Sequence, residues 1–183
     1  IFPQFRMELK RTVYHELIYE VKHGNIDVAL VVTHDTAKLD PGLDMLTLRK
    51  IHYYLVGSLE HPIWNKKREL EALNREVLIV PADSNPCTVM QREVIEQKGI
   101  FPEIKTAEDT ETNSLWIEAG MGVSIVNQAH IIYRAKAYRP MRVEQITQIP
   151  DARVSLIWNK SHVTNMMELF FGFLKQSIKE VAD

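Results

Sequence analysis

Short polar side chains directly follow apolar runs, or open helices, at four places in this chain. They are Thr33, His34, Ser84, Asn85, Thr112, Asn113, Ser114, Asn127 and Gln128. In open α/β sheets, ligands settle beyond the carboxyl ends of the strands, where helix N-termini offer backbone N–H groups. These hydroxyl and amide groups therefore predict a site for a small polar or anionic molecule. The same side chains would equally serve as helix caps, so the pattern leaves both roles open.

No recognisable catalytic or metal-binding set accompanies these residues. The sequence has no G-x-S-x-G elbow, no phosphate loop ending in G-K-S/T and no H-E-x-x-H pair. The segment Gly120-Met121-Gly122 lacks the third glycine of a dinucleotide fingerprint. Seven histidines and the single Cys87 show no paired ligand spacing. We therefore expect a binding protein rather than an enzyme, with no metal and no cofactor.

The elements that position these residues are clearest between Leu17 and Val32. Leu17, Ile18 and Val21 lie at helical spacing, and Gly24 suits the left-handed position after a helix end. The run Val28–Val32 lacks polar alternation, which predicts a strand covered on both faces, as in a parallel sheet.

The remaining chain alternates in the same way. Further strands are expected at residues 5–13, 46–59, 77–80, 122–126 and 154–158, and helices at 14–23, 69–73, 85–98, 112–120 and 164–181. Strands that alternate with helices of this length favour a parallel α/β architecture.

Composition limits the classes of function. The chain has 183 residues, 45% of them hydrophobic, and can bury one large core or two small ones. A net charge of −2 is unlike a domain that grips nucleic acid. One cysteine, no signal segment at the start and no long apolar run make the cytoplasm the expected location.

Four segments resemble the effector-binding domain of LysR-type transcriptional regulators. They are residues 17–30 (L-I-x-x-V-x-x-G-N-I-D-V-A-L), 2–10 (Phe2-Pro3 and an alternating strand), 55–63 (a strand and an H-P turn) and 117–126 (containing A-G-x-G-V-x-I). Ile63 stands where leucine is usual, and Asn127 where proline is usual.

The resemblance implies an α/β fold of two Rossmann-like subdomains joined by two crossover strands, like type 2 periplasmic-binding proteins. Residues 1–80 with 160–183 would form subdomain I, and residues 81–159 subdomain II. The crossing points would be Pro81 and Asn159-Lys160. A small-molecule effector would bind in the cleft between the subdomains, and the change would pass to a winged helix-turn-helix domain absent from this chain.

The family's linker helix and the first strand and helix of its effector domain would precede Ile1. The resemblance also implies a homodimer or dimer of dimers, with helix 85–98 and residues Ile1 and Phe2 as candidate contacts. DNA would be contacted only through the winged helix, and no membrane is expected.

Two alternatives remain open at this point. An extracytoplasmic solute-binding protein of the same fold would carry an upstream signal peptide. An enzyme on a Rossmann-like sheet would show turnover of a ligand.

Overall fold

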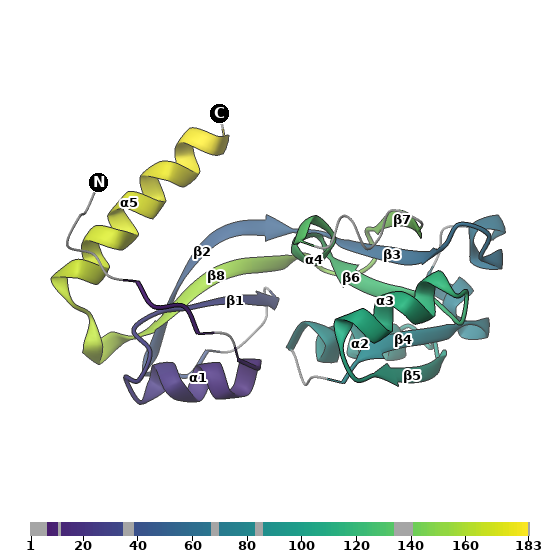
Figure 1. Ribbon diagram of the computed structural model, residues 1–183, viewed down its shortest axis with the longest axis horizontal. Coiled ribbons are helices and arrows are strands. Elements are labelled where there is room, and N and C mark those ends of the chain that lie inside the picture. The colour runs from purple at the N-terminus through teal and green to yellow at the C-terminus, as the bar shows by residue number, and fades with distance from the viewer. Residues whose placement is uncertain are drawn as a thin grey trace.

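The protein is described by a computed structural model over residues 7–10, 12–34, 39–66, 70–82, 86–133 and 141–182. The helices are α1 (Tyr14–Lys22), α2 (Pro86–Gln97), α3 (Thr110–Glu118), α4 (Gln128–Tyr133) and α5 (Asn165–Ala182), with 3-10 helices η1 (Pro62–Asn65), η2 (Leu70–Arg75) and η3 (Lys160–His162). The strands are β1 (Ala29–His34), β2 (Leu43–Ile51), β3 (Tyr53–Ser58), β4 (Val77–Pro81), β5 (Glu103–Ala107), β6 (Ser124–Asn127), β7 (Met141–Ile146) and β8 (Ala152–Asn159). Figure 1 shows two sheets side by side in an elongated molecule.

The first sheet has the strand order β1-β8-β2, and both pairings are antiparallel. On one face α1 buries Val21 against Val31 and Ile157. On the other face α5 buries Met167 and Phe171 against Leu156. Helices thus cover both faces, as burial of apolar strand residues requires.

The second sheet combines β6-β3-β7 with the parallel pair β4-β5. The two parts are joined because Ile79 N donates to Val123 O at 2.8 Å and Val123 N donates to Val77 O at 2.9 Å. Gly122 permits this close approach, since a Cβ there would lie 2.4 Å from Val77 O. The resulting order is β5-β4-β6-β3-β7.

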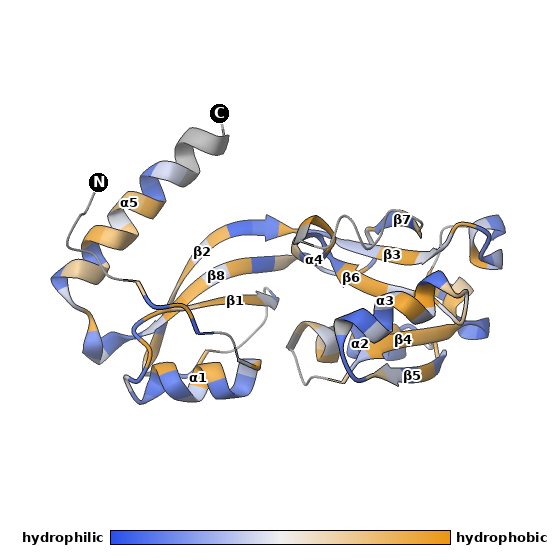
Figure 2. Ribbon diagram, in the orientation of Figure 1, coloured by the Kyte–Doolittle hydropathy of each residue, from blue (hydrophilic) through white to orange (hydrophobic). Residues whose placement is uncertain are grey.

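Each face of the second sheet has its own apolar cluster. On one face η1, η2 and α2 pack Leu73 and Ile95 around Leu78 and Ile125. On the other face α3 and α4 pack Ile117 and Ile131 around Ile79. Figure 2 shows the hydrophobic colour concentrated on the strands β4 and β6 between these helices.

The chain passes between the two sheets twice. His52 alone separates β2 from β3, and residues 147–151 connect β7 to β8. The two connections lie together, since His52 Nδ1 and Asp151 Oδ1 are 2.8 Å apart. These positions differ from the crossing points expected at Pro81 and Asn159-Lys160, because β4 belongs to the second sheet and β8 to the first. We propose subdomains of residues 12–51 with 152–182, and residues 53–146.

Most of the expected elements are present within a few residues of their expected bounds. The helix expected at 69–73 is the 3-10 helix η2, the strand expected at 46–59 is divided into β2 and β3, and α3 begins at Thr110, two residues early. The segments β5, β7 and α4 were not expected.

Two expectations about strands were wrong. Residues 7–10 form no strand, and Met7 and Leu9 are 63% and 86% exposed. The run at Val28–Val32 becomes β1, but it pairs antiparallel with β8, and Leu30 is 60% exposed. Leu30 alternates with the buried Ala29 and Val31, so its side chain projects from the face of β1 opposite α1.

Candidate functional site

The topology brings several strand ends to one edge of the second sheet. Strands β4, β5 and β6 run parallel, so Pro81, Ala107 and Asn127 end at the same edge. Strand β3 runs in the opposite direction, and its first residue, Tyr53, lies opposite Asn127. Helices α2 and α3 follow β4 and β5, and therefore begin beyond this edge. Their N-terminal N–H groups favour polar or anionic groups there.

The first sheet meets this edge through β1. The thiol of Cys87, in the first turn of α2, donates to the carbonyl of Val32 at a distance of 3.5 Å. The last two residues of β1, Thr33 and His34, lie beyond that contact. The start of α2, which packs on the second sheet, therefore meets the end of β1, which belongs to the first sheet. We call this contact region the β1–α2 junction.

Two buried hydroxyl groups, those of Thr33 and Tyr53, flank the β1–α2 junction. The Thr33 hydroxyl has no hydrogen-bond partner, although the residue is only 2% exposed. The Tyr53 hydroxyl, in a residue that is 0% exposed, lies beside the side chains of Cys87 and Gln91. Burial raises the pKa of the Tyr53 hydroxyl, and the neighbouring Cys87 adds to the rise, while Gln91 opposes it. Because a buried hydroxyl without a partner is unfavourable, the junction is a place where an incoming polar group would be stabilised.

Helix α3 contributes buried polar residues from its first turns. Asp109 caps the helix, since its carboxylate accepts from Thr112 N at 2.7 Å. Asn113 and Ser114 are 4% and 7% exposed, and the side-chain oxygen of Asn113 has no hydrogen-bond partner. Thr112, Asn113 and Ser114 were all expected site residues, but Asp109, not Thr112, caps the helix.

The other expected residues divide into two groups. Asn127 accepts from His130 N at 2.9 Å and so caps α4, and the backbone N–H of Gln128 donates to His52 O at 2.8 Å. Both have structural roles, at the edge of the sheet that faces the junction. Ser84 and Asn85 lie outside the described residues.

Tyr53 and Gln91 were missed by sequence analysis. Tyr53 stands inside an apolar and aromatic segment, where a strand residue is the natural interpretation. Its position at the edge depends on the division of the expected long strand at His52, which no local pattern indicated.

The described part of the chain offers no candidate metal site or membrane span. It contains no group of three His, Cys, Asp or Glu side chains placed to hold a metal ion. Within the same residues, no helix combines the length and apolar character needed to cross a bilayer.

Comparison with known proteins places this geometry in a family. The family model for the LysR substrate binding domain matches residues 2–179. A search of curated protein sequences gave no significant match.

Solved structures resemble the chain at low sequence identity. The BenM effector binding domain with its effector benzoate has 16% identity and a TM-score of 0.78, over 99% of this chain and 82% of that chain. The effector binding domain of QuiR in complex with shikimate has 18% identity and a TM-score of 0.74, over 92% of this chain and 79% of that chain. Full-length CbnR complexed with its target DNA has 19% identity and a TM-score of 0.73, over 93% of this chain but 59% of CbnR.

The two-sheet fold, with its polar strand ends gathered at one junction, is that of an effector-binding domain of the type 2 periplasmic-binding-protein class. The chain belongs to the LysR substrate-binding domain family.

Proposed function

We propose that this regulatory domain binds a small polar or anionic metabolite at the β1–α2 junction. The observation that carries the proposal is the buried, unpaired hydroxyl of Thr33, with the buried hydroxyl of Tyr53 on the other side of the junction. The two residues belong to different sheets, so a ligand bonded to both would link the two subdomains. Asn113 and the starts of α2 and α3 offer further polar groups on the second sheet.

The mechanism that fits this arrangement is a shift between subdomain orientations. In the described part of the chain the backbone passes between the sheets at His52 and at residues 147–151, so small backbone rotations there would change how the subdomains face each other. An effector that binds one orientation more tightly shifts the population toward it. The regulator's DNA-binding region would then receive the change, and DNA would be contacted there and not by this domain.

We also propose that the domain has no catalytic activity, acts in the cytoplasm and works as a homodimer or dimer of dimers. The apolar side chain of Val89 on α2, which is 47% exposed, supports α2 as a contact between copies. Sedimentation at micromolar concentration tests this assembly, and a clean monomer would count against it.

A thermal-shift screen with small carboxylates, including benzoate and shikimate, tests the effector site. A ligand that binds only the folded state raises the melting temperature. We expect Thr33→Val and Tyr53→Phe to reduce the shift for any hit, because each removes one hydroxyl without changing the shape of the side chain much.

Thr47→Val is the matched control, since the Thr47 hydroxyl lies 3.4 Å from the Ser155 hydroxyl within the first sheet. This variant should leave the ligand-induced shift unchanged. Equal shifts in the native protein and in both junction variants would refute the proposed site.

A further inference from the structure

A hollow lies on the second sheet, where Ile146 of its lining pairs with Tyr53 across β7 and β3. It is bounded by β3, β7, η1 and η2 and is partly open to solvent. Its apolar walls include Leu55, Ile63, Leu73 and Ile146. We call it the η1–η2 hollow.

One wall of the η1–η2 hollow is formed by Trp64, whose indole contacts Ser58, Arg142 and Gly57. Its Nε1–H donates to Ser58 O at 2.7 Å, and the Arg142 guanidinium carbon lies 5.0 Å from the ring centroid. Gly57 makes room for the ring on β3, since a Cβ there would lie 3.0 Å from the indole. A fixed aromatic wall favours planar partners and loses little entropy when one binds.

The charges around the hollow are already paired. The Lys66 ammonium bonds to the Glu76 carboxylate, which is itself 10% exposed. The Arg142 guanidinium is 2.5 Å from the Glu144 carboxylate. An anionic ligand would have to displace one of these carboxylates, whereas a neutral ligand would not.

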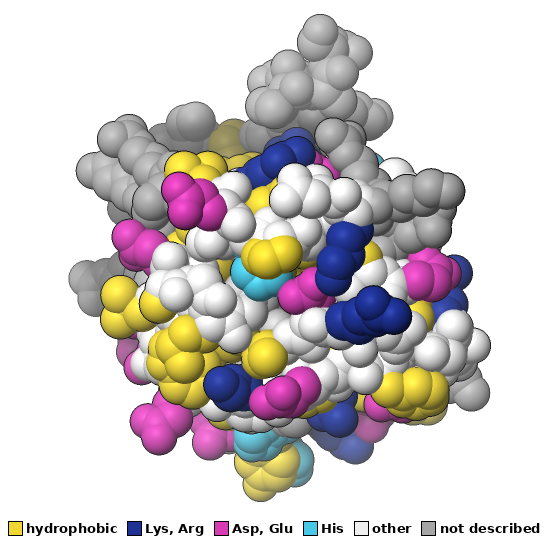
Figure 3. Space-filling view, turned by 90° about the vertical axis from the view of Figure 1, so that its right-hand side faces the viewer, with side chains coloured by type: hydrophobic (Ala, Val, Ile, Leu, Met, Phe, Trp, Pro, Cys, Tyr) yellow, Lys and Arg dark blue, Asp and Glu magenta, His cyan; other side chains and the backbone are white. Residues whose placement is uncertain are grey.

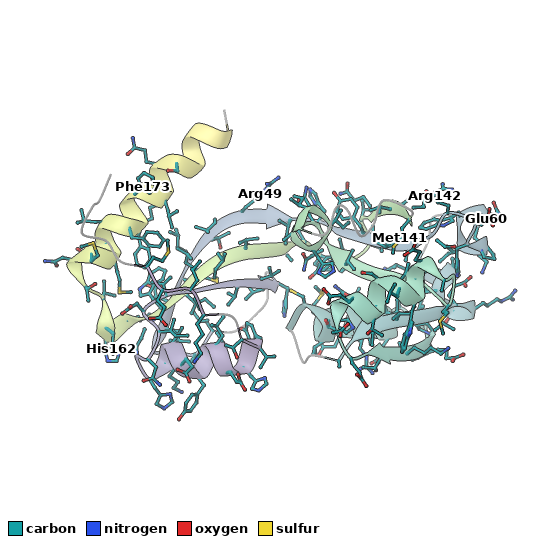
Figure 4. The ribbon with its side chains drawn as sticks, viewed as in Figure 1. Arg49, Glu60, Met141, Arg142, His162 and Phe173 are labelled. Atoms are coloured by element: carbon teal, nitrogen blue, oxygen red, sulfur yellow. The ribbon has the colours of Figure 1, made fainter. Side chains whose placement is uncertain are left out.

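The remaining polar groups are amides. Gln145 and Gln148 line the hollow together with the apolar wall. Figure 3, which views this end of the molecule, shows acidic and basic side chains interspersed and not gathered into a patch of one sign. Figure 4 places Arg142 and Met141 on β7 at the same end, with Glu60 beyond them.

From these features we propose that the η1–η2 hollow is a second ligand site, for a small, planar, uncharged molecule that carries an amide or a similar hydrogen-bonding group. Apolar walls with a few polar groups are the usual chemistry of small-molecule sites. Ile146, the last residue of β7, and Gln148, within the connection 147–151 between the subdomains, both line the hollow. An occupant therefore contacts the segment that must move when the subdomains reorient.

Benzamide and benzoate form a matched pair of probes, since they share a ring and differ in charge. The indole N–H signal of Trp64, assigned by Trp64→Phe, reports binding in two-dimensional NMR spectra. We expect benzamide to shift this signal in a saturable way, and benzoate to bind there about tenfold more weakly, because it lacks a free cationic partner.

Ala72→Leu adds bulk to the wall of the hollow and should weaken the benzamide shift at least tenfold. Ala119→Leu, at an exposed position after α3, is the control and should leave the shift unchanged. If Ala72→Leu does not fold, nuclear Overhauser contacts from benzamide to Trp64 and Leu55 in the native protein decide the question.

No Trp64 shift at millimolar benzamide would overturn the second site. Contacts only to residues of the β1–α2 junction, or benzoate binding at Trp64 as tightly as benzamide, would also overturn it. The junction site has its own test, which relies on Thr33→Val and Tyr53→Phe, so failure of the second site leaves that test standing.

Discussion

At the scale of single residues, Gly122 is fixed by a backbone contact and not by a ligand. A Cβ at this position would lie 2.4 Å from Val77 O and 3.0 Å from Val77 Cβ. These atoms belong to β4 and cannot move without breaking the link between β4 and β6. The incomplete dinucleotide fingerprint around Gly120 and Gly122 therefore has a structural explanation.

Gly122→Ala should lower the free energy of unfolding by about 3 kcal/mol, because the added methyl separates the two strands. Gly172→Ala is the matched control, since a Cβ at Gly172 in α5 meets nothing within 4 Å. That variant should raise stability by about 0.5 to 1 kcal/mol through higher helix propensity. Urea unfolding measures the unfolding free energy of both variants. Similar changes in the two would contradict the role of Gly122 in the close approach of β4 and β6.

His61 links stability to pH at the start of η1. Its Nδ1 accepts from Ile63 N at 3.3 Å, and the residue is 8% exposed. Burial lowers the pKa of the His61 imidazole, with Glu76 acting in the opposite direction and Lys66 adding to the fall. The unfolded chain therefore takes up a proton at a higher pH than the folded protein does.

The contribution of neutral His61 is complete above its unfolded pKa of about 6.5 and decreases as the pH falls from there toward the lower folded value. His61→Asn keeps a capping side chain that does not titrate. Its unfolding free energy should fall less between pH 7.5 and pH 5.5 than that of the native protein. His162→Asn, at an exposed histidine, is the control and should keep the native pH dependence.

At the scale of elements, the start of α3 depends on one capping side chain. Asp109 has extended backbone angles, and its carboxylate accepts from Thr112 N at 2.7 Å. Asp109→Ala should lower the unfolding free energy by about 1 kcal/mol, because it removes the cap. Asp109→Asn should keep most of the stabilisation, because an amide oxygen can accept the same hydrogen bond. Thermal denaturation compares the two, and an equal loss in both would show that capping is not the cause.

The helices at the two ends of the chain illustrate how well local patterns indicate an element. Helix α1 ends at Lys22, and Gly24 has a φ of 73° in the left-handed region, as its glycine stop predicted. Helix α5 begins at Asn165, where Thr164 Oγ1 accepts from Met167 N at 3.3 Å. Caps and stops lie within a few residues of the positions they control, so they can be read from sequence.

At the scale of the whole molecule, the pair His52–Asp151 joins the two connections between the sheets. Both side chains are partly exposed, at 43% and 39%, so the pair contributes a modest energy. Its position matters more than its strength, since motion between the subdomains must bend both connections.

His52→Ala should widen the distribution of subdomain orientations, with a larger radius of gyration by small-angle X-ray scattering, while the melting temperature changes little. Asp151→Ala should have the same effect, and the double variant should add almost nothing to either single change. His15→Ala, at an exposed position on α1, is the control. Additive effects of the two variants would show that the pair does not act as a unit.

The sequence by itself determined the α/β class, the placement of most helices and strands, and nine candidate polar residues. These properties follow from spacing, capping and glycine stops, which act over a few residues. The resemblance in four ordered segments also indicated the family, which the family model confirms.

Only the tertiary structure decided how the strands pair. Strand β8 inserts between β1 and β2, and β4 joins the second sheet, so the connections fall at His52 and residues 147–151. Pairing depends on residues far apart in the chain, and no local pattern encodes it. For the same reason only the structure identified Tyr53 as a second buried hydroxyl beside the junction, and distinguished the unpaired oxygen of Asn113 from the capping role of Asn127.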